Sequence, residues 1–90
     1  MHFFTKMKKE DKQIIEEGLA KIVETFDGIK NKLNLSEDCH LGDFKDRLKL
    51  SYYKLPNHQE ITMYNFDKEG IKHRVKIEIE QTPYKKWKQN

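Results

Sequence analysis

Cysteine, glycine and long apolar runs are scarce in this chain, and each shortage excludes a class of protein. The 90 residues include one cysteine, Cys39, so no intrachain disulfide can form. The four glycines form no Gly-rich phosphate loop. No stretch approaches the roughly 18 consecutive apolar residues of a membrane span, and the first residues lack the apolar run of a signal peptide. We therefore expect a single cytoplasmic domain over residues 1–90, without a membrane segment.

Arginine is also scarce, with two residues against sixteen lysines. Arginine is the usual bidentate reader of guanine, whereas lysine acts mainly as a point charge, so sequence-specific DNA recognition is not expected. Positive charge is concentrated in residues 71–90, which hold six Lys and Arg against two Glu. A basic end of this kind attracts a polyanion or an acidic protein surface, or simply keeps the terminus soluble.

A helical repeat of apolar residues occupies the N-terminal third of the chain. Steps of three and four, the period of one face of an amphipathic helix, run through Ile15, Leu19, Ile22, Phe26, Ile29 and Leu33. Asp27 and Gly28 could end the helix, but Ile29 and Leu33 continue the same period, so Asn34 is the expected stopping point, with a cap or turn there. The pattern predicts a helix over about residues 9–34.

Three later segments alternate with the period of a strand. In residues 71–81, one face carries Ile71, His73, Val75, Ile77 and Ile79, and the other carries Lys72, Arg74, Lys76, Glu78 and Glu80. Residues 47–55 and 60–66 alternate in the same way. Turn residues separate the three segments, and Gly70 can take a left-handed conformation in the second turn. The order predicts a three-stranded antiparallel β-meander.

The helix and the sheet each have one apolar face, and we expect these faces to cover each other. The predicted fold class is α+β, with one long N-terminal amphipathic helix packed on the three-stranded meander. Phe3 and Phe4 could add a short N-terminal edge strand. Residues 36–46 are the least regular part, and residues 83–90 form a basic tail.

The histidines and the cysteine do not have the spacing of a metal site. Zinc sites pair ligands at short spacing, and only Cys39 and His40 are close, as neighbours whose side chains diverge in an ordinary loop. Two acidic residues precede Cys39, a setting that disfavours a reactive thiolate. His73 lies on an apolar strand face, where a place at the edge of the core is the simplest role. We expect no catalytic, cofactor or metal site, and therefore a non-enzymatic protein.

The best functional signal is a mixture of aromatic and basic side chains on the sheet face away from the helix. Such a face can neutralise phosphates and stack bases, or anchor a protein interface. Glu78 and Glu80 share this face, which favours a partner of mixed charge. The expected binding residues are Tyr53, Tyr64, Lys72, Arg74 and Lys76 in the sheet, and Tyr84, Lys85, Lys86 and Trp87 in the tail.

The order of elements resembles two known families. A helix before three antiparallel strands is similar to the first part of double-stranded-RNA-binding domains, and a sheet wrapped by a helix resembles cystatin-like inhibitors. The second helix of the RNA-binding family, with its run of lysines, has no counterpart here, because residues 83–90 are too few. The motifs of the cystatins are missing as well. The sequence is therefore assigned to neither family.

Two classes of function follow from these patterns. The first, which we favour, is a small binding protein that acts by protein–protein contact, such as the inhibitors or modulators that phages and mobile elements encode against host defence nucleases. The second is a non-sequence-specific RNA- or DNA-binding accessory protein that uses the basic–aromatic face and tail. We expect a monomer, or a homodimer formed through a sheet edge.

Overall fold

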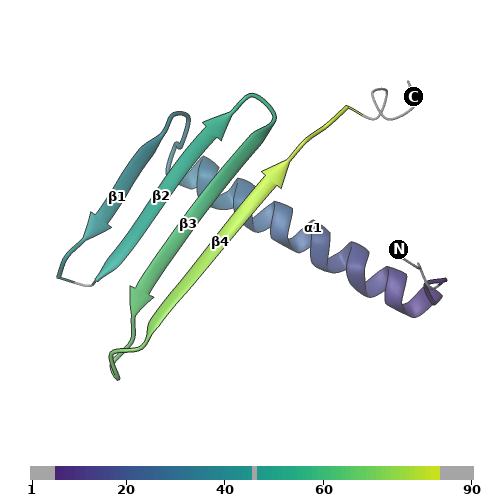
Figure 1. The fold of residues 1–90 in the computed structure, drawn as a ribbon, viewed down its shortest axis with the longest axis horizontal. Helices are drawn as coiled ribbons and strands as arrows, with labels where there is room; N and C mark the ends of the chain where they lie inside the picture. Colours follow the sequence, from purple (N-terminus) through teal and green to yellow (C-terminus); the bar gives the residue numbers. More distant parts are fainter. Residues whose placement is uncertain (1–5, 46, 84–90) are drawn as a thin grey trace, which may run out of the picture.

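The computed structural model describes residues 6–45 and 47–83, and it has one helix and four strands within these ranges (Figure 1). They are α1 Lys9–Lys32, β1 Cys39–Asp43, β2 Leu48–Leu55, β3 His58–Phe66 and β4 Lys72–Glu80. Each strand pairs antiparallel with the next, in the order β1-β2-β3-β4. Because α1 packs on one face of this sheet, the predicted α+β class is confirmed.

The prediction of three strands was wrong, since β1 adds a fourth. β1 falls in the segment judged irregular, because its five residues include Gly42 and bury only Cys39 in part. A segment with so little apolar alternation carries no strand signal. β1 takes its form from pairing with β2, in a register that runs from Cys39 opposite Tyr52 to Asp43 opposite Leu48. Phe3 and Phe4, named as a possible edge strand, lie outside the described residues.

The helix ends as the sequence predicted, around Asn34. α1 stops at Lys32, and Asn34 has a φ of 55°, which is the left-handed conformation. The Leu35 N–H donates to the Lys30 carbonyl at 2.9 Å, and the Asn34 N–H donates to the Asn31 carbonyl at 3.3 Å. These two bonds satisfy carbonyls that the helix end would leave unpaired. They also turn the chain back, so that Leu35 is buried under the sheet.

The core is small and lies where the C-terminal part of α1 crosses the sheet. Among the described residues, the buried hydrophobic side chains are Phe26, Leu35, Tyr52 and Ile61. Tyr52, Ile61 and Ile77 form one rung across the inner face of the sheet, the face that α1 covers. The Tyr52 hydroxyl donates to Gln59 Oε1 at 2.8 Å, so this buried polar group is satisfied.

α1 is much longer than the sheet is wide. Its 24 residues span about 36 Å at the usual helical rise, whereas four strands span about 19 Å. α1 runs across the strands and flanks β4 around Lys21, Ile22 and Thr25. Residues 9–20 then continue past β4, and we call them the overhang (Figure 1). The expectation that the helix stripe and the sheet cover each other therefore holds only for the C-terminal part of α1.

Candidate functional site

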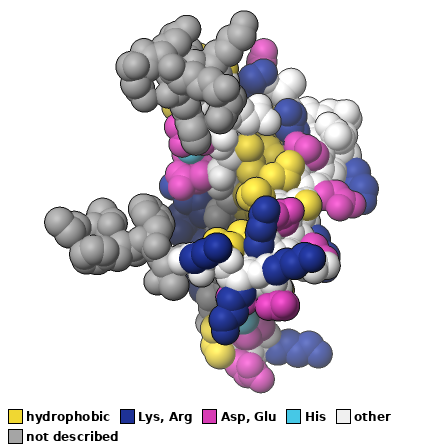
Figure 2. Space-filling view, turned by 90° about the vertical axis from the view of Figure 1, so that its right-hand side faces the viewer, with side chains coloured by type: hydrophobic (Ala, Val, Ile, Leu, Met, Phe, Trp, Pro, Cys, Tyr) yellow, Lys and Arg dark blue, Asp and Glu magenta, His cyan; other side chains and the backbone are white. Residues whose placement is uncertain are grey.

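The overhang and the adjoining turn of α1 beside β4 keep their apolar face exposed. Ile15, Leu19 and Ile22, which we call the apolar strip, are 54%, 62% and 51% exposed. At about 100° of rotation per residue, they lie on the same side of α1 as the buried Phe26. The strip therefore faces the layer that the sheet would occupy if it continued past β4. Figure 2 views the molecule from the side on which α1 extends past β4, and it shows hydrophobic side chains gathered among Lys, Asp and Glu.

β4 lies beside the overhang and forms an edge of the sheet. Among the strands of the described chain it pairs with β3 alone, over nine residues that contain no proline or glycine. A long regular edge of this kind presents unpaired backbone groups on which another strand can add.

Every second residue of β4 turns its backbone groups toward that open edge. The two ends of the β3–β4 pairing show which residues these are, because Asp67 N–H donates to the Ile71 carbonyl and Gln81 N–H donates to the Asn57 carbonyl. Hydrogen-bonded pairs recur at every second residue of an antiparallel ladder, so the odd-numbered residues of β4 bond to β3. The residues that face the open edge are then Lys72, Arg74, Lys76, Glu78 and Glu80.

The inner face of the sheet is also only partly covered by α1. Between Leu33 and the first half of β2 lies a hollow with mainly aliphatic walls. A second hollow separates Ile22 and Thr25 of α1 from residues 75–78 of β4. Val75 is 52% exposed and Leu48 is 50% exposed, although both point toward the core side. We call this region the open half, and it consists of Leu41, Leu48, Leu50, Met63 and Val75.

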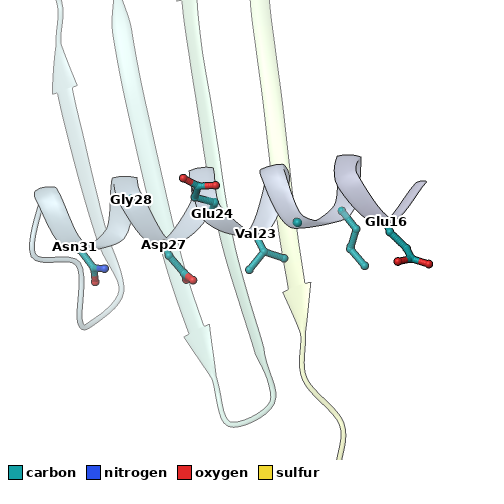
Figure 3. A pocket seen from close by; sticks show the side chains of 8 residues that line it. Glu16, Val23, Glu24, Asp27, Gly28 and Asn31 are labelled. Atoms are coloured by element: carbon teal, nitrogen blue, oxygen red, sulfur yellow. The ribbon is translucent and has the colours of Figure 1, made fainter. Parts of the chain in front are cut away.

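A further depression follows α1 itself. Its lining comes entirely from the helix, and Figure 3 shows the lining residues spaced along α1 from Glu16 to Asn31. Val23 is half-buried here, whereas Glu24 and Asp27 are exposed. A depression with a single wall does not enclose a small molecule, which needs contacts on most of its surface. It is the flank of the helix rather than a pocket.

The outer face of the sheet brings together part of the predicted binding set. Arg74 lies opposite Tyr64, and the Lys72 ammonium is 4.3 Å from the centroid of the Tyr64 ring. Phe66 packs edge-on against Tyr64 with ring centroids 6.1 Å apart. These contacts make a cationic–aromatic cluster at one end of the face. Because Lys72 lies over the Tyr64 ring, a base could stack on that side only by displacing the lysine.

Lys76 lies with acidic residues instead of with that cluster. Its Nζ is 3.5 Å from Glu60 Oε2 and 3.4 Å from Glu78 Oε1, and His58 Nε2 is 3.2 Å from Glu60 Oε1. The pKa of Glu60 is lowered, mainly by the hydrogen bond with His58. Desolvation is the next largest effect and opposes this shift, whereas the charge of Lys76 adds a smaller lowering. The outer face is therefore divided into a cationic end and an acidic end.

This acidic end contains the described residues best placed to hold a metal ion. Ligand atoms of His58, Glu60 and Glu78 lie within 4.8 Å of one another. The Lys76 ammonium already sits beside both carboxylates and supplies their counter-charge. This cluster was not predicted from the sequence. Its local signal is the His58-x-Glu60 spacing, which puts both residues on one strand face, but only the β3–β4 register brings Glu78 opposite Glu60.

The remaining predicted binding residues do not join the cationic–aromatic cluster. Tyr53 lies at the β1–β2 side of the sheet, where its hydroxyl is 3.3 Å from His40 Nε2 and the two rings meet edge to face. The four tail residues lie outside the described residues, and they are Tyr84, Lys85, Lys86 and Trp87.

Comparison with protein-family models, with curated proteins and with solved structures found no match. Within residues 6–45 and 47–83, no helix combines the length and the apolar character that crossing a membrane demands. The features of the described residues that bear on function are the exposed apolar strip, the free β4 edge and the divided outer face.

Proposed function

We propose that this chain is a non-enzymatic binding protein that acts by protein–protein contact through α1 and β4. The observation that carries this proposal is the apolar strip, in which three large aliphatic side chains are each more than half exposed on a helix that runs past its own sheet. Complete burial of such a side chain contributes about 1.5–3 kcal/mol. A row of such side chains beside a free sheet edge therefore offers another protein a large favourable free energy of binding.

The shape of the surface favours a macromolecule over a small ligand. The strip is straight and open, and the adjoining hollows have walls on one or two sides. A helix or a strand of another protein can lie along such a surface, whereas a metabolite would stay largely in water. A binding protein of this kind acts as an inhibitor or modulator in the cytoplasm by occupying a surface that its partner uses.

Nucleic-acid binding is the second candidate, and the cationic–aromatic cluster favours it. Lys72 and Arg74 flank Tyr64, and the Lys49 ammonium lies 5.2 Å from the centroid of the exposed Phe44 ring. Phosphates could meet these cations on the outer face. The candidate ranks second because Glu60 and Glu78 pair with Lys76 on the same face.

Affinity capture with a matched pair of variants tests the proposed protein contact. Leu19→Lys puts a charge in the apolar strip, and Gln13→Lys puts the same charge on the opposite side of α1, beside Glu17. Both residues are exposed, so both variants should fold. We expect the tagged wild type and the Gln13→Lys variant to retain the same partner from a cell extract, and the Leu19→Lys variant to lose it. If both variants retain the same proteins, the strip is not the contact surface.

Nuclease treatment of the same extract separates the two candidates. A partner held by α1 and β4 should remain bound after RNA and DNA are digested. Loss of binding on digestion, and in the Lys72→Ala/Arg74→Ala variant but not in Leu19→Lys, would favour the nucleic-acid function instead.

A further inference from the structure

We infer that the surface made by α1 and β4 binds a second copy of this chain, through antiparallel β4–β4 pairing about a two-fold axis. The inference rests on the proposed function and deepens it, because it names the partner of the same surface. It is carried by three separate features: the charges of β4, its free backbone groups, and the mutual fit of the overhang and the open half.

The charges of β4 are complementary to themselves when the strand is reversed. Lys72, Arg74 and Lys76 precede Glu78 and Glu80 along the same strand face. In a pairing with Ile77 opposite Ile77 of the second copy, Arg74 meets Glu80 and Lys76 meets Glu78. The two-fold axis repeats each pair, which gives four cross-strand pairs of opposite charge.

Other registers that keep the same strand faces together are worse. With Lys76 on the axis, Arg74 meets Glu78 and Lys72 meets Glu80, but Lys76 also meets itself, a like-charge pair that the register centred on Ile77 lacks. With Val75 on the axis, Arg74 meets Lys76. With Glu78 on the axis, Glu78 meets itself. Like charges directly opposite each other are destabilising, so the charge pattern selects the register centred on Ile77.

The free backbone groups of β4 suit the same register. Arg74, Lys76, Glu78 and Glu80 turn their N–H and C=O groups toward the open edge, as the hydrogen bonds at the two ends of the β3–β4 pairing require. The Arg74–Glu80 and Lys76–Glu78 pairs then become hydrogen-bonded pairs, and the two Ile77 residues form the non-bonded pair between them. The second copy can add without disturbing the β3–β4 ladder.

The overhang and the open half cover each other in this dimer. An axis perpendicular to the sheet keeps both helices on the same face of a continuous eight-stranded sheet. Such a sheet is about 38 Å wide, which matches the length of about 36 Å of α1. The apolar strip of each copy then lies over the inner face of the other, toward Val75 and the open half. Each copy supplies the layer that the other lacks.

An exchange of charges tests both the dimer and its register. Lys76→Glu and Glu78→Lys each turn two opposite-charge pairs into like-charge pairs, whereas an equimolar mixture of the two variants has opposite charges at every position. By sedimentation equilibrium, we expect the wild type to be a dimer and each single variant to have a dissociation constant raised about tenfold or more. We expect the mixture to form a heterodimer with nearly the wild-type constant, which also shows that both variants fold.

The matched control is Lys72→Glu, which makes the same change of charge on the same strand face. In the register centred on Ile77, Lys72 lies opposite Thr82, so this variant should keep the wild-type dissociation constant. A tenfold loss in Lys72→Glu would indicate the register centred on Lys76, where Lys72 meets Glu80, and would overturn the pairing inferred here.

Other results overturn the dimer itself. A wild type that stays monomeric into the millimolar range has no specific self-association. A dimer whose dissociation constant is the same in Lys76→Glu, Glu78→Lys and the wild type uses another surface. A monomeric chain whose captured partner is lost in Leu19→Lys would sink this inference and leave the proposed function standing. Suppose instead that the dimer depends on the charges of β4, but that the Leu19→Lys variant still captures the same other proteins as the wild type. The dimer inference would then stand, and the proposed function would fail.

Discussion

Asp67 organises the turn that begins β4. Its Oδ1 accepts the backbone N–H groups of Glu69 and Ile71, both at 2.9 Å, and its Oδ2 lies 3.0 Å from His73 Nε2. Gly70 takes the left-handed conformation that this turn requires, with φ +83°. The pKa of Asp67 is held below its ordinary value of 3.8, first by the hydrogen bond with His73 and next by that from Ile71, against a smaller effect of desolvation.

Replacement of His73 should change the titration of Asp67. A carboxyl whose pKa is lowered in the folded state stabilises the fold above its ordinary pKa, and that stabilisation is lost as pH falls through the lowered pKa. We expect His73→Ala to move the pKa of Asp67 back toward 3.8, as followed by carboxyl NMR during acid titration. We also expect the variant to lose less stability than the wild type on acidification below this pH. An unchanged Asp67 titration would show that His73 is not its partner.

At the scale of elements, the sequence predicted the helix and the strands whose apolar residues repeat with a clear helical or strand period. The apolar stripe of α1 and the alternation of β4 needed no partner to be recognised, and the turn at Gly70 followed from glycine itself. β1 was missed because a five-residue strand with one half-buried side chain depends on β2 for its form. The helical period also tells which residues share a face but not what lies opposite, so the exposure of the apolar strip could not be predicted.

The candidate site was predictable only in part, for a related physical reason. Alternation correctly placed Tyr64, Lys72 and Arg74 on one outer face, where they lie together. It could not place Lys76 with Glu60, because that contact depends on the register between two strands. That some strand has a free edge follows for any open sheet. The sequence alone did not show that this strand is β4, because it does not give the order of the strands in the sheet.

Two Gly→Ala substitutions should have opposite effects on α1 and on the β3–β4 turn. At Gly28, inside α1, a Cβ would have no atom within 4 Å, so alanine should raise the free energy of unfolding by about 0.5–1 kcal/mol. At Gly70 the same change forces a side chain onto φ +83° and should lower it by about 1 kcal/mol or more. Urea unfolding of both variants measures these shifts. Shifts of the same sign would contradict this account.

At the scale of the whole molecule, the small core matters most. Four buried hydrophobic side chains among the described residues are few for a chain of this length, and α1 places only Phe26 among them. A domain of this size buries a smaller share of its surface than a large domain does, so its free energy of unfolding is small. In the dimer, the apolar strip and the open half would add to the core of each copy.

Thermal stability should therefore depend on protein concentration. A folded state that gains stability by pairing melts at higher temperature when more copies are present. We expect the wild-type Tm to rise over an approximately hundredfold range of concentration in scanning calorimetry, and the Tm of Leu19→Lys to stay constant. A wild-type Tm that does not change with concentration would mean that each chain is stable alone.

The shortness of β1 has a consequence for how far assembly can proceed. β1 has five residues against the nine of β4, contains Gly42, and carries no run of opposite charges that could match itself. Two-fold pairing uses the β4 edge of both copies and leaves a β1 strand at each outer end. In the proposed dimer, growth of the sheet would then stop after one addition, so the pair would be finite and would avoid the open-ended polymer to which long bare edges lead.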